Sequence, residues 1–241
     1  MSIIFYRQFG NVYSLQNAST LSSLTYYWPV VSGQLMELVQ GANLICIVPA
    51  NAMFVSDRLN VSGDAARITN SSNYLVAPPG VYFAGDFTIT LWYATNVSPG
   101  RNWPHLIDFG NGPESDNVVL VASQYNDNMP IFRSLSGASA ATACDLSVGG
   151  QALALNQWYH LAVVQQGGNM VLYIDGVPDW QLCSFPPRAV NRTQNYFGYS
   201  PWLGADLIDG SIDEVKFFGR ALAQSEVQTD MAGQGVKLVN L

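Results

Sequence analysis

Short runs of β-branched and aromatic residues recur along the chain and alternate with clusters of turn-forming residues. Residues 87–92 (FTITLW) and 170–174 (MVLYI) are two of the runs, and residues 77–80 (APPG) and 110–113 (GNGP) are two of the clusters. The runs follow one another at spacings of about ten residues without a sustained helical period. This pattern predicts an antiparallel β sandwich.

Alternation within one run indicates which side chains face the core. Tyr159, Leu161 and Val163 occupy every second position of a predicted strand, so we expect them on one buried face. Trp92 and Trp158 are also expected in the core, because large aromatic side chains dominate sandwich interiors.

The C-terminal part of the chain predicts a core strand followed by a short helix. Residues 206–227 (DLIDGSIDEVKFFGRALAQSEV) change from β-forming to helix-favouring composition after Arg220. The β-forming apolar residues are Ile212, Val215 and Phe217. Asp213 and Glu214 are adjacent in this strand and should therefore point to opposite faces of the sheet.

Six motifs follow one another in the order found in the laminin G-like, concanavalin A-like jelly-roll domains, which the chain resembles. They are residues 86–92 (DFTITLW), 105–110 (HLIDFG), 158–163 (WYHLAV), 172–176 (LYIDG), 195–200 (NYFGYS) and 210–226 (GSIDEVKFFGRALAQSE). The resemblance implies an all-β, two-sheet antiparallel jelly-roll sandwich with a short helix near the C-terminus. We expect this domain to span residues 28–241.

Residues 1–27 precede most of the family pattern and form a strand-rich extension, with residues 3–6 (IIFY) as one β-capable segment. Such a strand can add to its own sheet or to the open edge of a neighbouring molecule, which would make it an assembly arm. The apolar residues 236–241 (VKLVNL) favour association through the terminal segments. In the other interpretation, both ends complete their own sandwich.

Composition and charge exclude two classes of partner. The chain has a net charge of -7 and contains no run of Lys and Arg, so nucleic-acid binding has no electrostatic basis. No apolar run is long enough to cross a bilayer, so we expect no membrane span. The chain is 49% hydrophobic but only 11% charged, which leaves much of its surface to uncharged polar residues.

The signals for localisation conflict. Residues 1–10 (MSIIFYRQFG) lack the features of a signal peptide. The resembled family is mostly extracellular, however, and five sequons predict glycosylation in a secreted protein. They begin at Asn17, Asn60, Asn70, Asn96 and Asn191. We therefore expect an extracellular, secreted protein whose signal peptide is not visible in this chain.

The three cysteines show no metal-binding or redox spacing. Cys144 and Cys183 flank the two-strand unit of residues 158–176, where neighbouring strands could bring them together, and either a disulfide or two thiols fits this arrangement. Cys46 lies in an apolar run and is expected to be a small buried residue.

No catalytic constellation is present, although some enzymes share this sandwich. Laminarinase-type glycosidases carry two glutamates and an aspartate on one strand as E-x-D-x-x-E, and this chain has no such strand. His105 and His160 lie within predicted strands, without a nucleophile motif beside them. The sequence therefore predicts a protein that is not an enzyme.

The resemblance also implies a structural calcium ion, because members of the family often bind calcium through a "DR-x-G-N" loop and the aspartate of "IDE". Asp57, Asn60 and Asp213 are the matching candidates, but residues 59–64 (LNVSGD) replace the expected Gly-Asn. A second, weaker group of oxygen ligands is Asp108, Asp116 and Asn117. The alternative for residues 57–58 is a surface turn with an ion pair.

Aromatic residues in polar loops are candidates for stacking on sugar rings. They are Trp103, Tyr125, Trp180, Tyr199 and Trp202. The first functional hypothesis is thus a non-catalytic extracellular module that binds glycans or extracellular proteins. The alternative is a self-assembling structural subunit of an extracellular fibre, coat or matrix.

Overall fold

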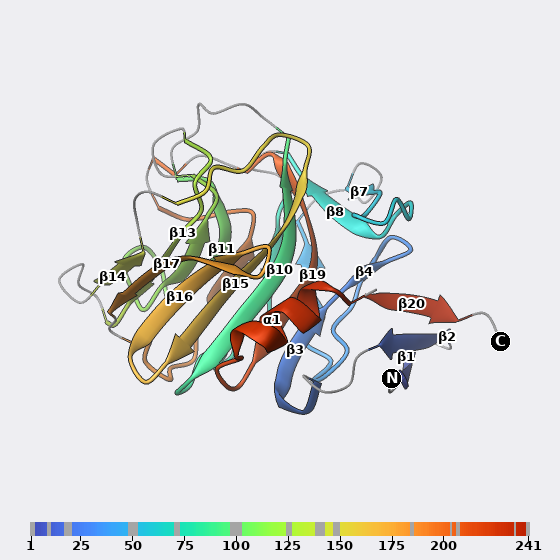
Figure 1. Cartoon of the computed structure of the whole chain (residues 1–241), viewed down its shortest axis with the longest axis horizontal. Helices are drawn as coiled ribbons and strands as arrows, with labels where there is room; N and C mark the ends of the chain where they lie inside the picture. The colour runs from blue at the N-terminus through green and yellow to red at the C-terminus, as the bar shows by residue number, and fades with distance from the viewer. Residues whose placement is uncertain are drawn as a thin grey trace.

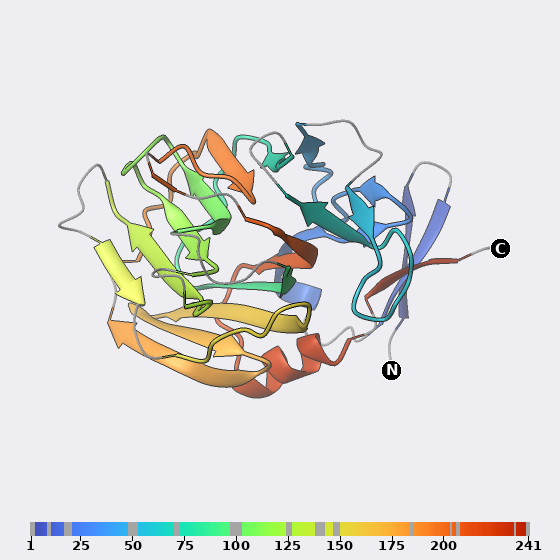
Figure 2. The same cartoon turned by 90° about the horizontal axis from the view of Figure 1, so that it is seen from above.

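The computed structural model of the protein describes residues 3–8, 11–16, 21–47, 53–69, 73–96, 103–123, 127–137, 143–146, 150–183, 186–202, 204–205, 208–233 and 235–239. Two large antiparallel sheets pack face to face, and a short helix lies on the outer side of one of them (Figures 1 and 2). This arrangement confirms the predicted all-β sandwich with a short C-terminal helix.

The first sheet has eight strands. Their order is β17 (Val177–Cys183), β16 (Asn169–Ile174), β15 (Trp158–Gln166), β10 (Phe87–Thr95), β19 (Gly210–Phe218), β8 (Ala65–Ile68) and β7 (Phe54–Val55), and β3 (Leu24–Trp28) also pairs with β19. Short pieces at residues 21–23 (η1), Val30–Val31 (β4) and Gln34–Leu35 (β5) flank β3.

The second sheet has seven strands, and its outer face carries the candidate site. Their order is β14 (Ala143–Leu146), β13 (Ile131–Leu135), β12 (Val118–Val121), β11 (His105–Gly110), β18 (Gln194–Phe197), β9 (Leu75–Ala77) and β6 (Ile45–Cys46).

The main core lies between the two sheets and is rich in aromatic rings. Trp28 is almost fully buried and packs edge-on against Phe197 of one sheet and Phe217 of the other, with ring centroids 5.6 and 5.2 Å away. Trp92 and Trp158, which the sequence placed in the core, do not belong to it, and this prediction was wrong. The guanidinium carbon of Arg58 lies 4.5 Å from the centroid of the Trp92 ring.

Strand β15 follows the predicted alternation on its core face. Tyr159, Leu161 and Val163 all lie in the main core. The intervening Ala162 and Val164 are also buried, because they belong to a second apolar cluster on the outer face of the sheet. This strand is therefore covered on both faces.

A β-bulge changes the side-chain pattern of β19. Glu214 has a φ of 50°, and the register of β10 with β19 shifts between the Thr90–Lys216 and Trp92–Asp213 pairs. The prediction that Asp213 and Glu214 point to opposite faces was wrong, because regular alternation does not hold across the bulge. Both carboxylates lie near Nη1 of Arg58, with Glu214 Oε1 at 2.9 Å and Asp213 Oδ2 at 4.0 Å.

Helix α1 (Gln224–Met231) covers the outer face of the eight-stranded sheet (Figure 1). Leu222 and Val227 pack in the second apolar cluster with side chains of β15. Beneath the helix, the buried carboxylate of Asp230 accepts hydrogen bonds from Lys216 Nζ at 2.9 Å and Thr90 Oγ1 at 2.8 Å. The helix is therefore held by apolar packing and by a buried polar network.

The two ends of the chain meet in a small sheet of their own. Strand β2 (Asn11–Gln16) pairs with β1 (Ile3–Gln8) on one side and with β20 (Val236–Val239) on the other. Strand β3 begins within the predicted extension of residues 1–27 but pairs with β19 of the sandwich. The domain boundary at residue 28 and the assembly arm stay predictions.

The predicted disulfide concerns two strands at the ends of the large sheets. Cys144 lies in β14 and Cys183 in β17, and these two strands contact each other. The side chains of both residues lie outside the described part of the chain, so the disulfide also stays a prediction.

Candidate functional site

The outer face of the seven-stranded sheet is built by strand alternation. In β12, Val118 and Leu120 face the main core, whereas Val119 and Val121 belong to a separate outer cluster with Ile131. Trp103 packs against this outer cluster, and Val119 of the cluster forms the apolar floor of a surface pocket.

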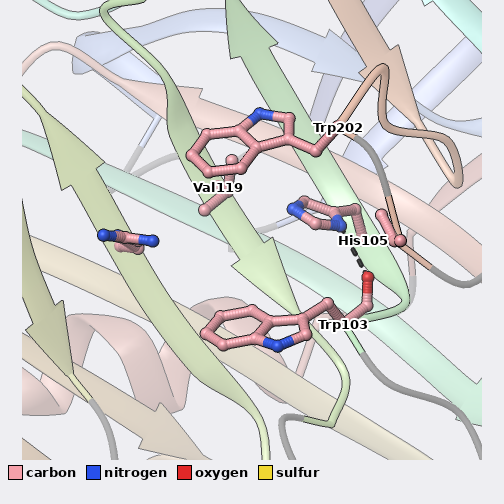
Figure 3. A pocket seen from close by; sticks show the side chains of 7 residues that line it. Trp103, His105, Val119 and Trp202 are labelled. Atoms are coloured by element: carbon pink, nitrogen blue, oxygen red, sulfur yellow. Dashed lines mark hydrogen bonds between the residues drawn. The ribbon is translucent and has the colours of Figure 1, made fainter. Parts of the chain in front are cut away.

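The pocket encloses about 150 Å³. Its lining residues are Trp103, His105, Val119, Arg133, Trp202, Gly204 and Ala205. Figure 3 shows the indole rings of Trp103 and Trp202 on opposite sides, with His105 between them. The pocket therefore has two aromatic walls and an apolar floor, and its polar side chains are those of His105 and Arg133.

Trp103 and His105 are held together at the start of β11. The N–H of Trp103 donates to the carbonyl of Ser123 at 3.1 Å, and the carbonyl of Trp103 accepts from Nδ1 of His105 at 2.7 Å. Burial lowers the pKa of His105 to about 4, so the ring is neutral at physiological pH. With its proton on Nδ1, the ring has Nε2 as a hydrogen-bond acceptor, and Figure 3 shows this nitrogen facing the space between the indoles.

Arg133 is the charged residue of the lining. It lies on β13, in register with Val119 of β12 and with Asp145 of β14. Its guanidinium carbon lies 5.7 Å from the centroid of the Trp202 ring, which places a planar group of hydrogen-bond donors at an aromatic wall.

The loop that carries Trp202 is anchored to the sheet through a buried carboxylate. Ser200 Oγ donates to Asp108 Oδ2 at 2.6 Å and accepts from the N–H of Trp202 at 3.3 Å. Asn117 Nδ2 donates to Asp108 Oδ1 at 2.8 Å. Burial raises the pKa of Asp108 to about 6. Asp108 is therefore a positioning residue for the loop.

Gly198 allows this loop to leave β18. Its φ is 78°, and a Cβ at this position would lie 2.5 Å from Cδ1 of Ile68. Both the backbone angle and the close approach favour glycine.

The sequence identified part of this pocket. Trp103 and Trp202 were predicted as binding residues, and the structure places both in the lining of the pocket. Tyr199 lies on the same loop as Trp202 but stacks on Tyr74 rather than lining the pocket. Tyr125 and the side chain of Trp180 lie outside the described residues.

The two polar lining residues, His105 and Arg133, were not predicted as binding residues. His105 was interpreted as an ordinary strand residue, and Arg133 was not considered. The available signal for Arg133 was a lone charge within the apolar strand of residues 131–135 (IFRSL).

The residues expected to bind calcium have partners within the protein. Asp57 Oδ1 accepts from the N–H groups of Leu59 and Val61 at 2.9 and 2.7 Å. Asp213 Oδ1 accepts from the N–H groups of Val30 and Glu214 at 3.1 and 2.7 Å. Asn60 is exposed at a turn.

The weaker metal candidates are also engaged. Asp116 accepts two hydrogen bonds from Arg188, at 2.8 and 2.6 Å, and one from the N–H of Gly137. Asn117 bonds Asp108, as described above. Among the described residues there is no group of three or more His, Cys, Asp or Glu side chains placed to hold a metal ion. The carboxylates of both predicted sets thus already accept hydrogen bonds within the protein, and the calcium ion stays a prediction.

We expect calcium to leave the thermal stability of the protein unchanged, because its buried carboxylates already have protein donors. Melting curves recorded in millimolar calcium and in EDTA should coincide. A higher melting temperature in calcium that is lost in Asp213→Asn would instead support the ion predicted from the sequence.

The predicted glycosylation sites differ in accessibility. Asn60 and Asn191 are exposed. Asn96 is partly buried, and its Nδ2 donates to Asn156 Oδ1 at 3.0 Å. Asn17 and Asn70 lie outside the described residues. Glycosylation of all five stays a prediction.

No helix in the described part of the chain is both long and apolar enough to span a membrane.

Solved structures share this fold at low sequence identity. Domain 4 of AbnA, an extracellular GH43 arabinanase from Geobacillus stearothermophilus, in complex with arabinotriose, has a TM-score of 0.66 at 20% identity. The alignment covers 87% of this chain and 98% of that domain. The ligand binding domain of botulinum neurotoxin serotype D, in complex with N-acetylneuraminic acid, has a TM-score of 0.63 at 15% identity. Here the alignment covers 89% of this chain and about half of the other, 52%.

The binding domain of Paraclostridial Mosquitocidal Protein 1 is also similar, with a TM-score of 0.64 at 17% identity over 87% of this chain and 52% of that one. A sequence search against curated proteins finds no match.

A laminin G family model, described as the concanavalin A-like lectin/glucanases superfamily, matches residues 69–228. This range contains all six motifs on which the resemblance was based, as well as the strands that build the pocket. The match covers most of the chain. The chain therefore belongs to the concanavalin A-like lectin/glucanases superfamily.

Proposed function

We propose that the protein is a non-catalytic module that binds glycans in the pocket between Trp103 and Trp202. The observation that carries this proposal is the pair of indole rings on opposite sides of a small pocket. Sugar rings present apolar C–H faces and polar edges, and aromatic walls with a few polar groups suit both.

The polar groups of the pocket complement the hydroxyl groups of a sugar. Neutral His105 has an acceptor at Nε2, and the guanidinium group of Arg133 lies beside Trp202. Two of the similar structures contain a bound sugar, arabinotriose in one and N-acetylneuraminic acid in the other, which supports glycans as the ligand class.

Laminin G-like domains are typically extracellular, and we propose that this one is secreted. Calcium is no part of the proposal, because the carboxylates expected to bind it have protein donors. The self-assembling subunit stays the alternative. This alternative is based on the small sheet of β1, β2 and β20, in which β1 and β20 are the outer strands.

Removing one aromatic wall should weaken glycan binding. Trp103→Ala is expected to lower the affinity for the best ligand of a glycan array about tenfold or more, since it removes one stacking surface. Trp103→Phe keeps an aromatic ring and should retain most of the affinity. Isothermal titration calorimetry measures both variants.

The folded state of each variant is checked by its melting temperature. Equal affinities of the wild type and Trp103→Ala would place the sugar elsewhere, and no binding to any glycan on the array would contradict the proposed function.

A further inference from the structure

A second aromatic group lies on the same face of the seven-stranded sheet. Tyr74 and Tyr199 stack with ring centroids 4.4 Å apart and planes 18° apart. Tyr196 stands edge-on to both, at 5.7 and 5.0 Å. All three side chains are only partly buried, so they present aromatic surface to the solvent.

This group lies on the same sheet face as the pocket, two strands away from it. Tyr196 of β18 is in register with Asp108 of β11, which is in register with Val119 of β12, a residue of the pocket lining. Two inter-strand steps separate Tyr196 from Val119, or about 10 Å. That span exceeds the width of a single sugar ring.

One loop links the two aromatic surfaces. Tyr199 lies in the tyrosine group, and Trp202, three residues later, forms a wall of the pocket. Ser200 lies between them and donates to Asp108 Oδ2 at 2.6 Å. Because this anchor lies within the loop, it fixes both aromatic residues relative to the sheet.

The tyrosine group has the chemistry of a sugar platform rather than that of an ion site. Its members are uncharged, and burial raises the pKa of Tyr74 and Tyr196, which keeps both hydroxyls protonated at physiological pH. Each ring can therefore stack on a sugar face, while the hydroxyl can donate to and accept from sugar hydroxyls.

We propose that Tyr74, Tyr196 and Tyr199 form a second sugar subsite, so that the ligand is an oligosaccharide spanning the sheet from the pocket to these tyrosines. This inference rests on the proposed function of the pocket. It adds that the module recognises an internal stretch or an extended end of a glycan, and that the sugar over the tyrosines is uncharged.

The test uses the full chain and length series of linear arabino-, xylo-, gluco- and galacto-oligosaccharides, each from the monosaccharide to the hexasaccharide. Calorimetry is performed on the wild type, Tyr199→Ala, Tyr199→Phe and Trp103→Ala. For the series that binds, we expect the affinity to rise about tenfold once the chain is long enough to reach the tyrosines.

The variants separate the two subsites. Tyr199→Ala should reduce the affinity for the longest oligosaccharide to that of the short ones and leave the short ones unchanged. Tyr199→Phe should retain most of the gain with length, because its ring can still stack. Trp103→Ala should weaken binding at every length.

Three results would overturn the inference. If the affinity does not depend on oligosaccharide length and Tyr199→Ala binds as well as the wild type, the pocket alone is the binding site. The proposed function then still holds. A wild-type dimer that Tyr199→Ala converts to a monomer, with unchanged glycan affinity, assigns the tyrosines to self-association. Absence of binding by every series overturns this inference, and absence of any binding on the glycan array as well contradicts the proposed function too.

Discussion

Replacing Asp230 with alanine is expected to lower the free energy of unfolding by about 3–5 kcal/mol, the range found when one partner of a buried ion pair is removed. Asp230 is 7% exposed and accepts from Lys216 Nζ, Thr90 Oγ1 and His160 Nε2 at 2.9, 2.8 and 3.3 Å. Lys216 is itself 5% exposed, so its ammonium group would lose one of two buried partners and keep only Glu214 Oε2, at 3.1 Å. Urea denaturation measures the change.

Two further variants of α1 show whether the effect comes from the buried charge. Thr229→Ala removes an exposed side chain one position away and should change the free energy of unfolding by no more than about 0.5 kcal/mol. Asp230→Asn keeps the shape of the side chain but removes its charge, and should fall between the wild type and Asp230→Ala. If Asp230→Ala unfolds at the same urea concentration as Thr229→Ala, the network does not hold the helix.

The fold was predictable because local pattern and tertiary packing agree over most strands. The alternation of Tyr159, Leu161 and Val163 identified a core face correctly. It could not show that Ala162 and Val164 are covered as well, because the cluster that covers them includes Leu222 and Val227, about sixty residues later in the chain.

The bulge in β19 is visible in the sequence as a break in the regular alternation of core-facing residues. Ile212, Val215 and Phe217 all face the core, and their spacing contains a step of three residues instead of two. That step is where Glu214 takes a positive φ. Uniform alternation placed the two acidic residues on opposite faces, whereas the extra residue brings both near Arg58.

The pocket was predictable only in part, because its residues come from separate segments. Trp103 and Trp202 stood out as aromatic residues in polar loops, but their meeting depends on the register of β11 with β18 and on the Ser200 anchor. Tyr74 and Tyr196 gave no such signal, since a tyrosine in a β-forming segment is ordinary.

Asp108, which holds the loop of the pocket, is expected to make the protein less stable as the pH rises from about 4 to 7. Its pKa in the folded protein is about 6, above the ordinary value of 3.8, because the carboxylate is buried. Below pH 4 it is protonated in both the folded and unfolded states and contributes no difference. As the pH rises, the unfolded state ionises first, and above pH 6 the folded state carries a buried charge that costs about 3 kcal/mol.

Asp108→Asn isolates this contribution, because asparagine has nearly the same shape but cannot ionise. Its carbonyl can still accept from Asn117, and its amide can donate to Ser200 Oγ, so the loop that carries Trp202 and Tyr199 should keep its place. We expect the variant to match the wild type near pH 4 and to exceed its free energy of unfolding by about 1–3 kcal/mol at pH 7.5. Urea denaturation at several pH values gives this difference directly.

Asp116→Asn is the matched control, because the Arg188 guanidinium holds the pKa of Asp116 below its usual value. That carboxylate stabilises the protein above its unfolded pKa, so its replacement should be unfavourable at pH 7.5, in the opposite direction to Asp108→Asn. A difference between the wild type and Asp108→Asn that stays constant from pH 4 to 7.5 would show that Asp108 does not titrate in this interval. The anchor of the loop would then be a permanently charged group, stabilised by its two donors in spite of its burial.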